Sequence, residues 1–263
     1  MRFPLVGALV SVIALSSPAA AQERPFLFSV TTADDSQPAA RFDYDLGIGE
    51  RAFQSDIANQ PEHRIGVQAS YRRLTLLARL GVATEGSSYQ SSQSGELLYS
   101  VLGPGHRVAF AAGGGLLHEA DGVNVLLARV VTGRSTTSSD TYGNLLFQGP
   151  LAAGRDALDV ITSVGWARKL SHGLSAGIEA IGEDLEGFWE AEEAEGGARL
   201  LIGPTVHVSP TGKHWQLSAT GGPVFHPSNT GRVSNALRDL PPETRRTSYA
   251  FKVALSVALS SGP

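Results

Sequence analysis

The sequence contains no cysteine, which excludes disulfides, thiolate metal sites and cysteine nucleophiles. It is also poor in charge: 17% of its residues are charged and the formal net charge is −4, which argues against nucleic-acid binding because that function needs a basic face. After Ala21 no apolar run approaches the length of a transmembrane helix, although 42% of the residues are hydrophobic. An all-strand membrane protein would combine these features.

The N-terminus has the three parts of a secretory signal. Arg2 supplies a positive charge, Leu5–Leu15 forms an apolar core, and alanines at 19–21 provide a cleavage site. The core is too short to cross a membrane as a helix. We therefore expect residues 1–21 to be a cleaved signal peptide, the alternative being an uncleaved N-terminal anchor. Residues 22–40 then form a leader or an extra strand.

From residue 41 onward, hydrophobicity alternates with a period of two. The clearest example runs from Tyr249 to Leu259, where every second residue is large and apolar and the others are small or polar, with one lysine. Alternation of this kind predicts strands with one apolar and one polar face. We count about twelve such segments, each near the length of a tilted membrane-spanning strand. The expected fold is all-β, a transmembrane antiparallel β-barrel of about 12 strands formed by residues 41–263.

The lengths of the predicted connections alternate between short and long, as in outer-membrane barrels. This alternation disfavours a soluble periplasmic β-sandwich. An even strand number also places both chain ends in the periplasm. Short turns are expected at Arg72-Arg73, Gly103–Gly105, around Gly133, Ser171–Gly173 and Ser209–Gly212, and longer loops at Arg51–His63, Thr84–Ser94, Gly149–Arg155, Gly187–Gly196 and Pro227–Arg246. The remaining long-loop position is taken by a shorter connection, His118–Asp121.

Aromatic residues fall near both sets of connections, as expected for girdles at two membrane interfaces. They are Tyr71, Trp166 and Trp215 beside short turns, and Phe147, Phe188, Phe225 and Tyr249 beside long loops.

The segment Leu200–Phe225, LLIGPTVHVSPTGKHWQLSATGGPVF, resembles the penultimate hairpin of small outer-membrane β-barrels described as transporters associated with phenol degradation. Gly173–Trp189 fits the same pattern. The resemblance implies a barrel with a transport role and no catalytic residues to carry over. Barrels of this kind usually end in an aromatic residue that the barrel-insertion machinery recognises, whereas Leu259 stands there in this chain.

Two motifs contain residue types that could carry chemistry. His207 and Ser209 resemble the His-x-Ser pair of outer-membrane lipid hydrolases, and a strand would place both on one face. The pair nevertheless falls at the turn end of its strand, so a lumen histidine is the favoured interpretation and catalysis the alternative. The acidic runs at 183–186 and 190–195 lack the spacing of a calcium loop and are interpreted as a solvated loop. No metal or other cofactor is expected.

Charged residues on the predicted inner face would line the lumen. There they either tune the selectivity of a pore or pair across the interior and close it, and the sequence leaves both open. Because charge on the lipid face is costly, Arg129 and the pair Arg168-Lys169 test the predicted register. The lumen-lining residues are expected to be Asp43, Asp45, Arg79, Glu96, Glu179, Arg199 and His207.

These patterns favour a small channel or transporter in the cell outer membrane, without enzymatic activity. Its expected partners are outer-membrane lipids, the insertion machinery and a small-molecule solute, with no nucleic acid. Two alternatives stay open. One is an outer-membrane lipid hydrolase that uses His207 and Ser209, and the other is a non-conducting structural or surface-binding barrel.

Overall fold

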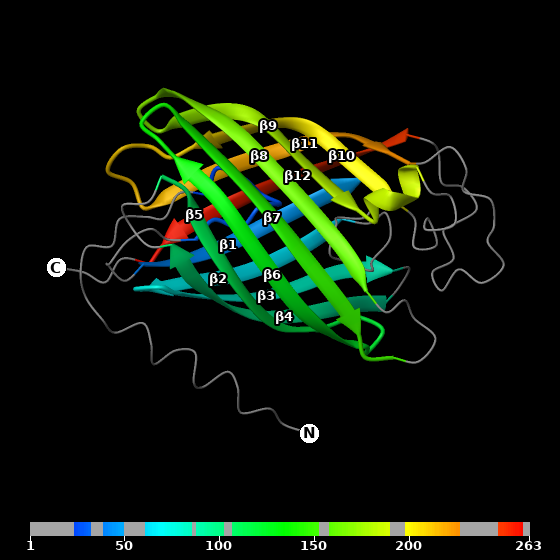
Figure 1. Ribbon diagram of the computed structural model, residues 1–263. Helices are drawn as coiled ribbons and strands as arrows, with labels where there is room; N and C mark the ends of the chain where they lie inside the picture. The colour runs from blue at the N-terminus through cyan, green and yellow to red at the C-terminus, as the bar shows by residue number, and fades with distance from the viewer. Residues whose placement is uncertain are drawn as a thin grey trace.

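Twelve antiparallel strands form a closed barrel in the computed structural model, which describes residues 24–32, 39–49, 61–85, 88–102, 107–152, 158–189, 198–226 and 247–259 (Figure 1). The elements are β1 Ala39–Gly49, β2 Glu62–Tyr71, β3 Leu74–Glu85, β4 Ser88–Leu102, β5 Ala109–His118, β6 Asn124–Ser135, β7 Ser139–Pro150, β8 Asp159–Ser171, β9 Leu174–Glu183, the 3-10 helix η2 Leu185–Phe188, β10 Arg199–Val208, β11 Trp215–Phe225 and β12 Thr247–Ala258.

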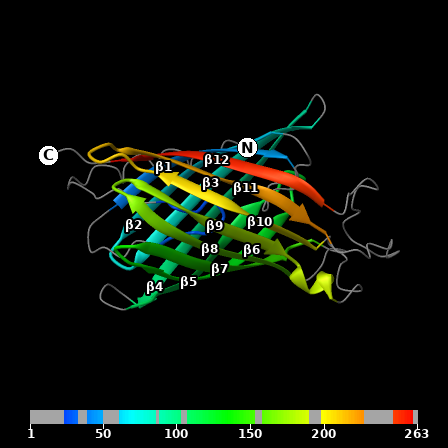
Figure 2. The ribbon, with the colours of Figure 1, turned by 90° about the horizontal axis from the view of Figure 1, so that it is seen from above.

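The strands follow chain order around the barrel, and β12 closes it by pairing with β1. Phe42 lies opposite Val257 and Leu46 opposite Val253 in this closing pair. Closure removes the free sheet edges, so every strand has two hydrogen-bonded neighbours. Figures 1 and 2 show the strands tilted in one sense around the barrel, as closure requires. The closed barrel confirms the predicted all-β barrel and excludes the β-sandwich.

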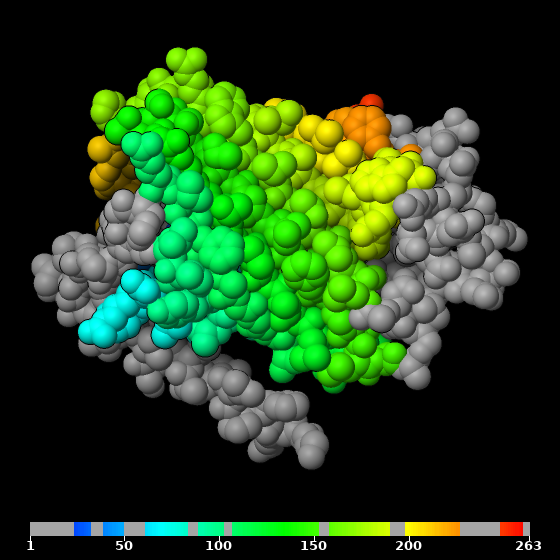
Figure 3. Space-filling view, viewed as in Figure 1, coloured from blue at the N-terminus to red at the C-terminus, as the bar shows by residue number. Residues whose placement is uncertain are grey.

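Side chains alternate between the two faces of the wall, apart from register shifts at Ser100/Leu102 and Lys169/Ser171. On β10, Leu201 and Thr205 are buried inside, whereas Ile202 and Val206 are exposed outside. Large apolar side chains cover the outer face. Figure 3 shows one side of this outer surface. Of the predicted girdle residues, Tyr71, Trp166, Trp215, Phe225 and Tyr249 are exposed, and Phe147 and Phe188 are half-buried.

Two predicted connections are wrong. The loop expected at Thr84–Ser94 is largely strand, because β3 continues to Glu85 and β4 begins at Ser88. Its Ser and Gln residues hid the strand, since a segment that is polar on both faces shows no alternation of hydrophobicity.

The turn expected around Gly133 lies further along the chain. β6 continues through Gly133 to Ser135, and the Thr136 hydroxyl oxygen accepts hydrogen bonds from the N–H groups of Ser138 and Ser139, at 3.2 and 2.9 Å. A threonine side chain therefore organises the turn, as Ser and Thr hydroxyls can. Gly133 instead leaves room for the Tyr142 ring, since a Cβ there would lie 2.2 Å from it.

Several expectations lie outside the described residues, including the signal peptide, the turn at Gly103–Gly105, the acidic run at 190–195 and the loop Pro227–Arg246. Among the described residues no helix combines the length and apolar character needed to cross a membrane.

Candidate functional site

The barrel lumen brings together the side chains that the alternation assigned to the inner face. Arg79 is half-buried there and the other predicted residues are buried, namely Asp43, Asp45, Glu96, Glu179, Arg199 and His207. Arg129 is also buried and points inward, while Arg168 is exposed outside, close to the β8–β9 turn. Lys169 turns inward to Asp140, with its Nζ 3.2 Å from Oδ1.

Residues 24–32, here called the lumen segment, lie inside the barrel (Figure 1, dark blue). The sequence left a leader or an extra strand open for this part of the chain, but the described residues form no strand and every one of them is buried. Phe26 is 0% exposed. The segment therefore crosses the space that a pore would use.

Glu179 of β9 holds the centre of the lumen segment. Its carboxylate accepts hydrogen bonds from three successive main-chain N–H groups: Leu27 at 3.0 Å to Oε2, and Phe28 and Ser29 at 2.8 and 2.9 Å to Oε1. Hydrogen bonds to a charged acceptor are stronger than neutral ones. Glu179 itself is fully buried, so the lumen segment supplies the donors that its charge requires.

A glycine lies beside Glu179 on each neighbouring strand. Gly165 of β8 and Gly203 of β10 are its two register partners. A Cβ on Gly165 would lie 2.4 Å from the Phe26 ring. The missing side chain at this position is what allows the Phe26 ring to lie against the wall.

Asn144 of β7 binds the next part of the lumen segment as a neighbouring strand would. Its Oδ1 accepts from the Val30 N–H at 2.9 Å, and its Nδ2 donates to the Val30 carbonyl at 3.2 Å. On the opposite wall, Gln68 Nε2 donates to the Thr31 carbonyl at 2.9 Å. The segment is thus bound by wall side chains on both sides of the lumen.

Arg24, at the beginning of the segment, forms a bidentate ion pair with Asp45 of β1. The two distances are 2.6 Å from Nη1 to Oδ1 and 2.9 Å from Nη2 to Oδ2. The Arg24 N–H also donates to Gln216 Oε1 at 2.8 Å, and Lys252 Nζ lies 3.3 Å from Asp45 Oδ2. Asp45, predicted as a pore-lining charge, therefore binds the segment instead.

His207 also faces the lumen segment. Ser218 Oγ donates to the Arg24 carbonyl at 2.7 Å, so His207 Nδ1 acts as the donor in its 2.9 Å contact with that hydroxyl. Nε2 of His207 has no hydrogen-bond partner among the described residues. No hydrogen bond therefore joins His207 to Ser209 in the described part of the chain, and the geometry does not assemble the pair that a hydrolase would need.

Two apolar clusters pack around the segment. Phe28 belongs to one, with wall residues such as Leu117, Ile181 and Leu201, and Phe26 belongs to the other. Its ring lies 6.2 Å from that of Tyr142, centroid to centroid, at an interplanar angle of 59°. The two phenylalanine side chains thus pack against apolar wall residues, while the main chain of the segment hydrogen-bonds to polar wall residues.

Sequence reasoning missed the lumen segment. The apolar run Phe26–Val30 in an otherwise polar leader was the one visible signal. The hydrogen bonds that hold it join residues far apart in the sequence, 192 positions in the case of Arg24 and Gln216.

Comparison with known proteins shows the fold and no closer relationship. Neither a family model nor a curated protein matches the sequence. Among solved structures, the NanC porin has a TM-score of 0.55 and 8% identity, covering 82% of this chain and 98% of the porin. Vibrio cholerae OmpT has a TM-score of 0.42 and 12% identity, with 88% and 99% covered. A BenF-like porin from Pseudomonas fluorescens has a TM-score of 0.38 and 14% identity, with 82% and 59% covered.

The fit of Phe26 against Gly165 gives a first prediction. Gly165→Ala is expected to lower the free energy of unfolding by about 1–3 kcal/mol, because the new methyl group overlaps the Phe26 ring. In a Phe26→Ala background the same change should be neutral or slightly stabilising, since alanine is otherwise favoured over glycine in a strand. Denaturant unfolding of the four variants measures the coupling. Additive effects would mean that the two residues do not touch.

Proposed function

We propose that this protein is an exported outer-membrane channel or transporter for small polar solutes, closed by its lumen segment. The outer face of the wall supports the membrane location, because apolar side chains such as Leu76, Leu126 and Val253 are exposed there. Soluble monomers rarely expose apolar surface on this scale, whereas a barrel in lipid has an apolar outside and a polar inside. Outer-membrane lipids and the insertion machinery are its proposed partners, and residues 1–21 its proposed signal peptide.

The observation that carries the proposal is that the polar wall hydrogen-bonds to a segment outside the sheet. Glu179, Asn144 and Gln216 all bind the main chain of the lumen segment. If the segment leaves, these side chains line a passage wide enough for a peptide and two phenylalanine rings. Such a polar passage would be filled by water and would conduct ions.

The fold shared with the NanC porin supports this proposal at the level of architecture. The resemblance of Leu200–Phe225 to transporters associated with phenol degradation suggests a transport role, and it stays a prediction. The proposed selectivity residues are inner-face charges that form no hydrogen bond with the described part of the lumen segment, Arg79 and Glu96 among them.

Replacing residues 24–32 by a Gly-Ser linker of the same length tests the proposal. Burial of Phe26 and Phe28 alone favours the closed state by about 3 kcal/mol or more, which corresponds to an open fraction of about 1% or less. Removing these contacts should therefore raise the mean conductance in planar bilayers by about a hundredfold.

A heat-dependent shift in gel mobility would serve as the control that the linker variant still folds as a barrel. A folded variant that conducts no better than the wild type would refute the channel and favour the non-conducting barrel. Lipid ester hydrolysis that depends on His207 and Ser209 would instead support the hydrolase.

A further inference from the structure

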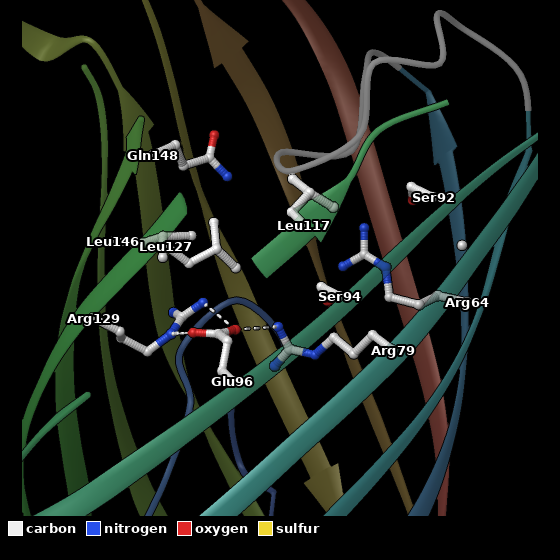
Figure 4. Close-up of a pocket in the computed structure, with 11 residues that line it drawn as sticks. Arg64, Arg79, Ser92, Ser94, Glu96, Leu117, Leu127, Arg129, Leu146 and Gln148 are labelled. Carbon is white, nitrogen blue, oxygen red and sulfur yellow. Dashed lines mark hydrogen bonds and ion pairs between the residues drawn. The ribbon is translucent and has the colours of Figure 1, made fainter. Parts of the chain in front are cut away.

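A pocket of about 30 Å³ lies inside the barrel between β2 and β7, and three arginines from different strands line it (Figure 4). They are Arg64, Arg79 and Arg129, and Glu96 is the one carboxylate among the lining residues. We call this space the Arg79 pocket. Its lining therefore carries an excess of positive charge.

The three guanidinium groups differ in how closely they bind carboxylates of the protein. Arg129 binds both oxygens of Glu96, at 2.6 and 3.0 Å, and Arg64 donates to Glu62 at 2.7 Å. Arg79 differs from both: among the described residues its carboxylate contact is with Glu96, at 3.7 Å from Nη1 to Oε1. That distance is too long for a hydrogen bond.

Arg79 is also more exposed than Arg129. The Arg79 side chain is 22% exposed, against 2% for Arg129. A guanidinium carries five N–H donors arranged in a fork that matches a carboxylate. Arg79 thus presents charge and donors to the pocket that its contact with Glu96 does not use.

The other side of the pocket is apolar. Leu117, Leu127 and Leu146 line it, from β5, β6 and β7. One water molecule needs a cavity volume of about 10–15 Å³. The pocket volume of about 30 Å³ therefore admits a group of only a few heavy atoms. A ligand with one anionic group and a short apolar part would match the arginine side and the leucine side of the pocket.

We propose that the Arg79 pocket binds the carboxylate of a small aliphatic acid, with the guanidinium of Arg79 as its principal ligand and the leucines against its apolar part. The inference deepens the proposed function by naming a solute class, and its meaning for transport rests on that function. Arg79 also lines a neighbouring space of about 20 Å³ whose wall includes Leu27–Thr31 of the lumen segment. A bound acid would therefore lie beside the segment that closes the lumen.

Calorimetric titration of the purified full chain in detergent with sodium acetate tests the site without any need for conduction. Acetate should bind the wild type, and acetamide, which has the same shape without the charge, should not. Arg79→Gln is expected to weaken acetate binding by about tenfold or more, because a charge-assisted hydrogen-bond pair is lost. Arg79→Lys should retain part of the affinity, since it keeps the charge but not the fork.

Arg168→Gln is the matched control, because Arg168 is an exposed arginine on the outer face and should leave binding unchanged. Should Arg79→Gln not fold, Ser94→Leu fills the pocket from β4 and should also abolish binding. The proposal would be overturned if acetate did not bind the wild type, or if acetamide bound equally well. Unchanged acetate affinity in the folded Arg79→Gln or Ser94→Leu variants would also overturn it. A linker variant that does not conduct, together with normal acetate binding, would refute the channel and leave the site standing.

Discussion

Replacing Glu179 by leucine is expected to release residues 24–32 from the lumen and to expose Ser29 to water. Leucine offers no acceptor to the N–H groups of Leu27, Phe28 and Ser29, and each buried unpaired N–H costs about 1–3 kcal/mol. The total rivals the benefit of burying the two phenylalanine rings, about 1.5–3 kcal/mol each. The balance therefore shifts toward the released segment, whose main chain is hydrated in water.

The absence of cysteine allows a direct measurement of this release. Ser29→Cys introduces a single thiol in place of a side chain that is 4% exposed. Maleimide labelling of this thiol should be slow in the parent barrel and about a hundredfold faster with Glu179→Leu, the ratio that about 3 kcal/mol produces. The mean conductance in planar bilayers should rise in parallel if the lumen is the conducting path.

Glu179→Gln provides the graded control. Its amide oxygen still accepts from two of the N–H groups, but its NH₂ faces the third, so labelling should be intermediate. A cysteine at Lys213, in the exposed β10–β11 turn, should label rapidly in every variant. Equal labelling of Ser29→Cys with glutamate and leucine at position 179 would show that the carboxylate does not hold the segment in place.

The strands and their faces were predictable because each depends on neighbouring residues. Alternation of hydrophobicity assigned Asp45, Glu96 and Glu179 to the inner face, and the structure places them there. The run Gly122–Thr132 is almost continuously apolar, so the same rule does not assign its two faces. Its register emerges only from pairing with β5 and β7, which turns Arg129 inward to meet Glu96.

What these residues bind was not predictable, because their partners are distant in sequence. Glu179 contacts Leu27, and Asn144 contacts Val30, 152 and 114 positions away. No local pattern encodes contacts of this kind. The lumen segment also forms no regular element, so a search for helix and strand periods cannot find it. Its position follows from the shape and polarity of the completed barrel.

The glycines Gly113–Gly115 acquire a structural role in the same way. In the barrel, Gly115 lies opposite Glu96 and Gly113 opposite Arg129, so the Arg129–Glu96 ion pair passes over β5 where the inward side chains are missing. A Cβ on Gly113 would also lie 2.0 Å from the Leu97 carbonyl oxygen of β4. Space for the ion pair and close approach of the strands both require glycine there.

That ion pair leads to the second large prediction. Arg129→Met should lower the free energy of unfolding by about 3–5 kcal/mol, because it leaves the buried Glu96 carboxylate without its bidentate partner. Arg79, at 3.7 Å, compensates only in part. The loss should therefore lie toward the lower end of this range. Denaturant titration of the folded protein in detergent, followed by the gel-mobility shift, measures it.

The decisive comparison is the double variant Glu96→Leu/Arg129→Met. The double variant removes both fully buried charges and leaves only the partly exposed Arg79 without its Glu96 contact, so it should be more stable than Arg129→Met alone by about 2 kcal/mol or more. The neighbouring residues Leu127 and Leu146 give the new side chains an apolar surface to pack against. If both variants were equally unstable, the loss would come from the packing of the Arg129 side chain. The charge left on Glu96 would then not be its source.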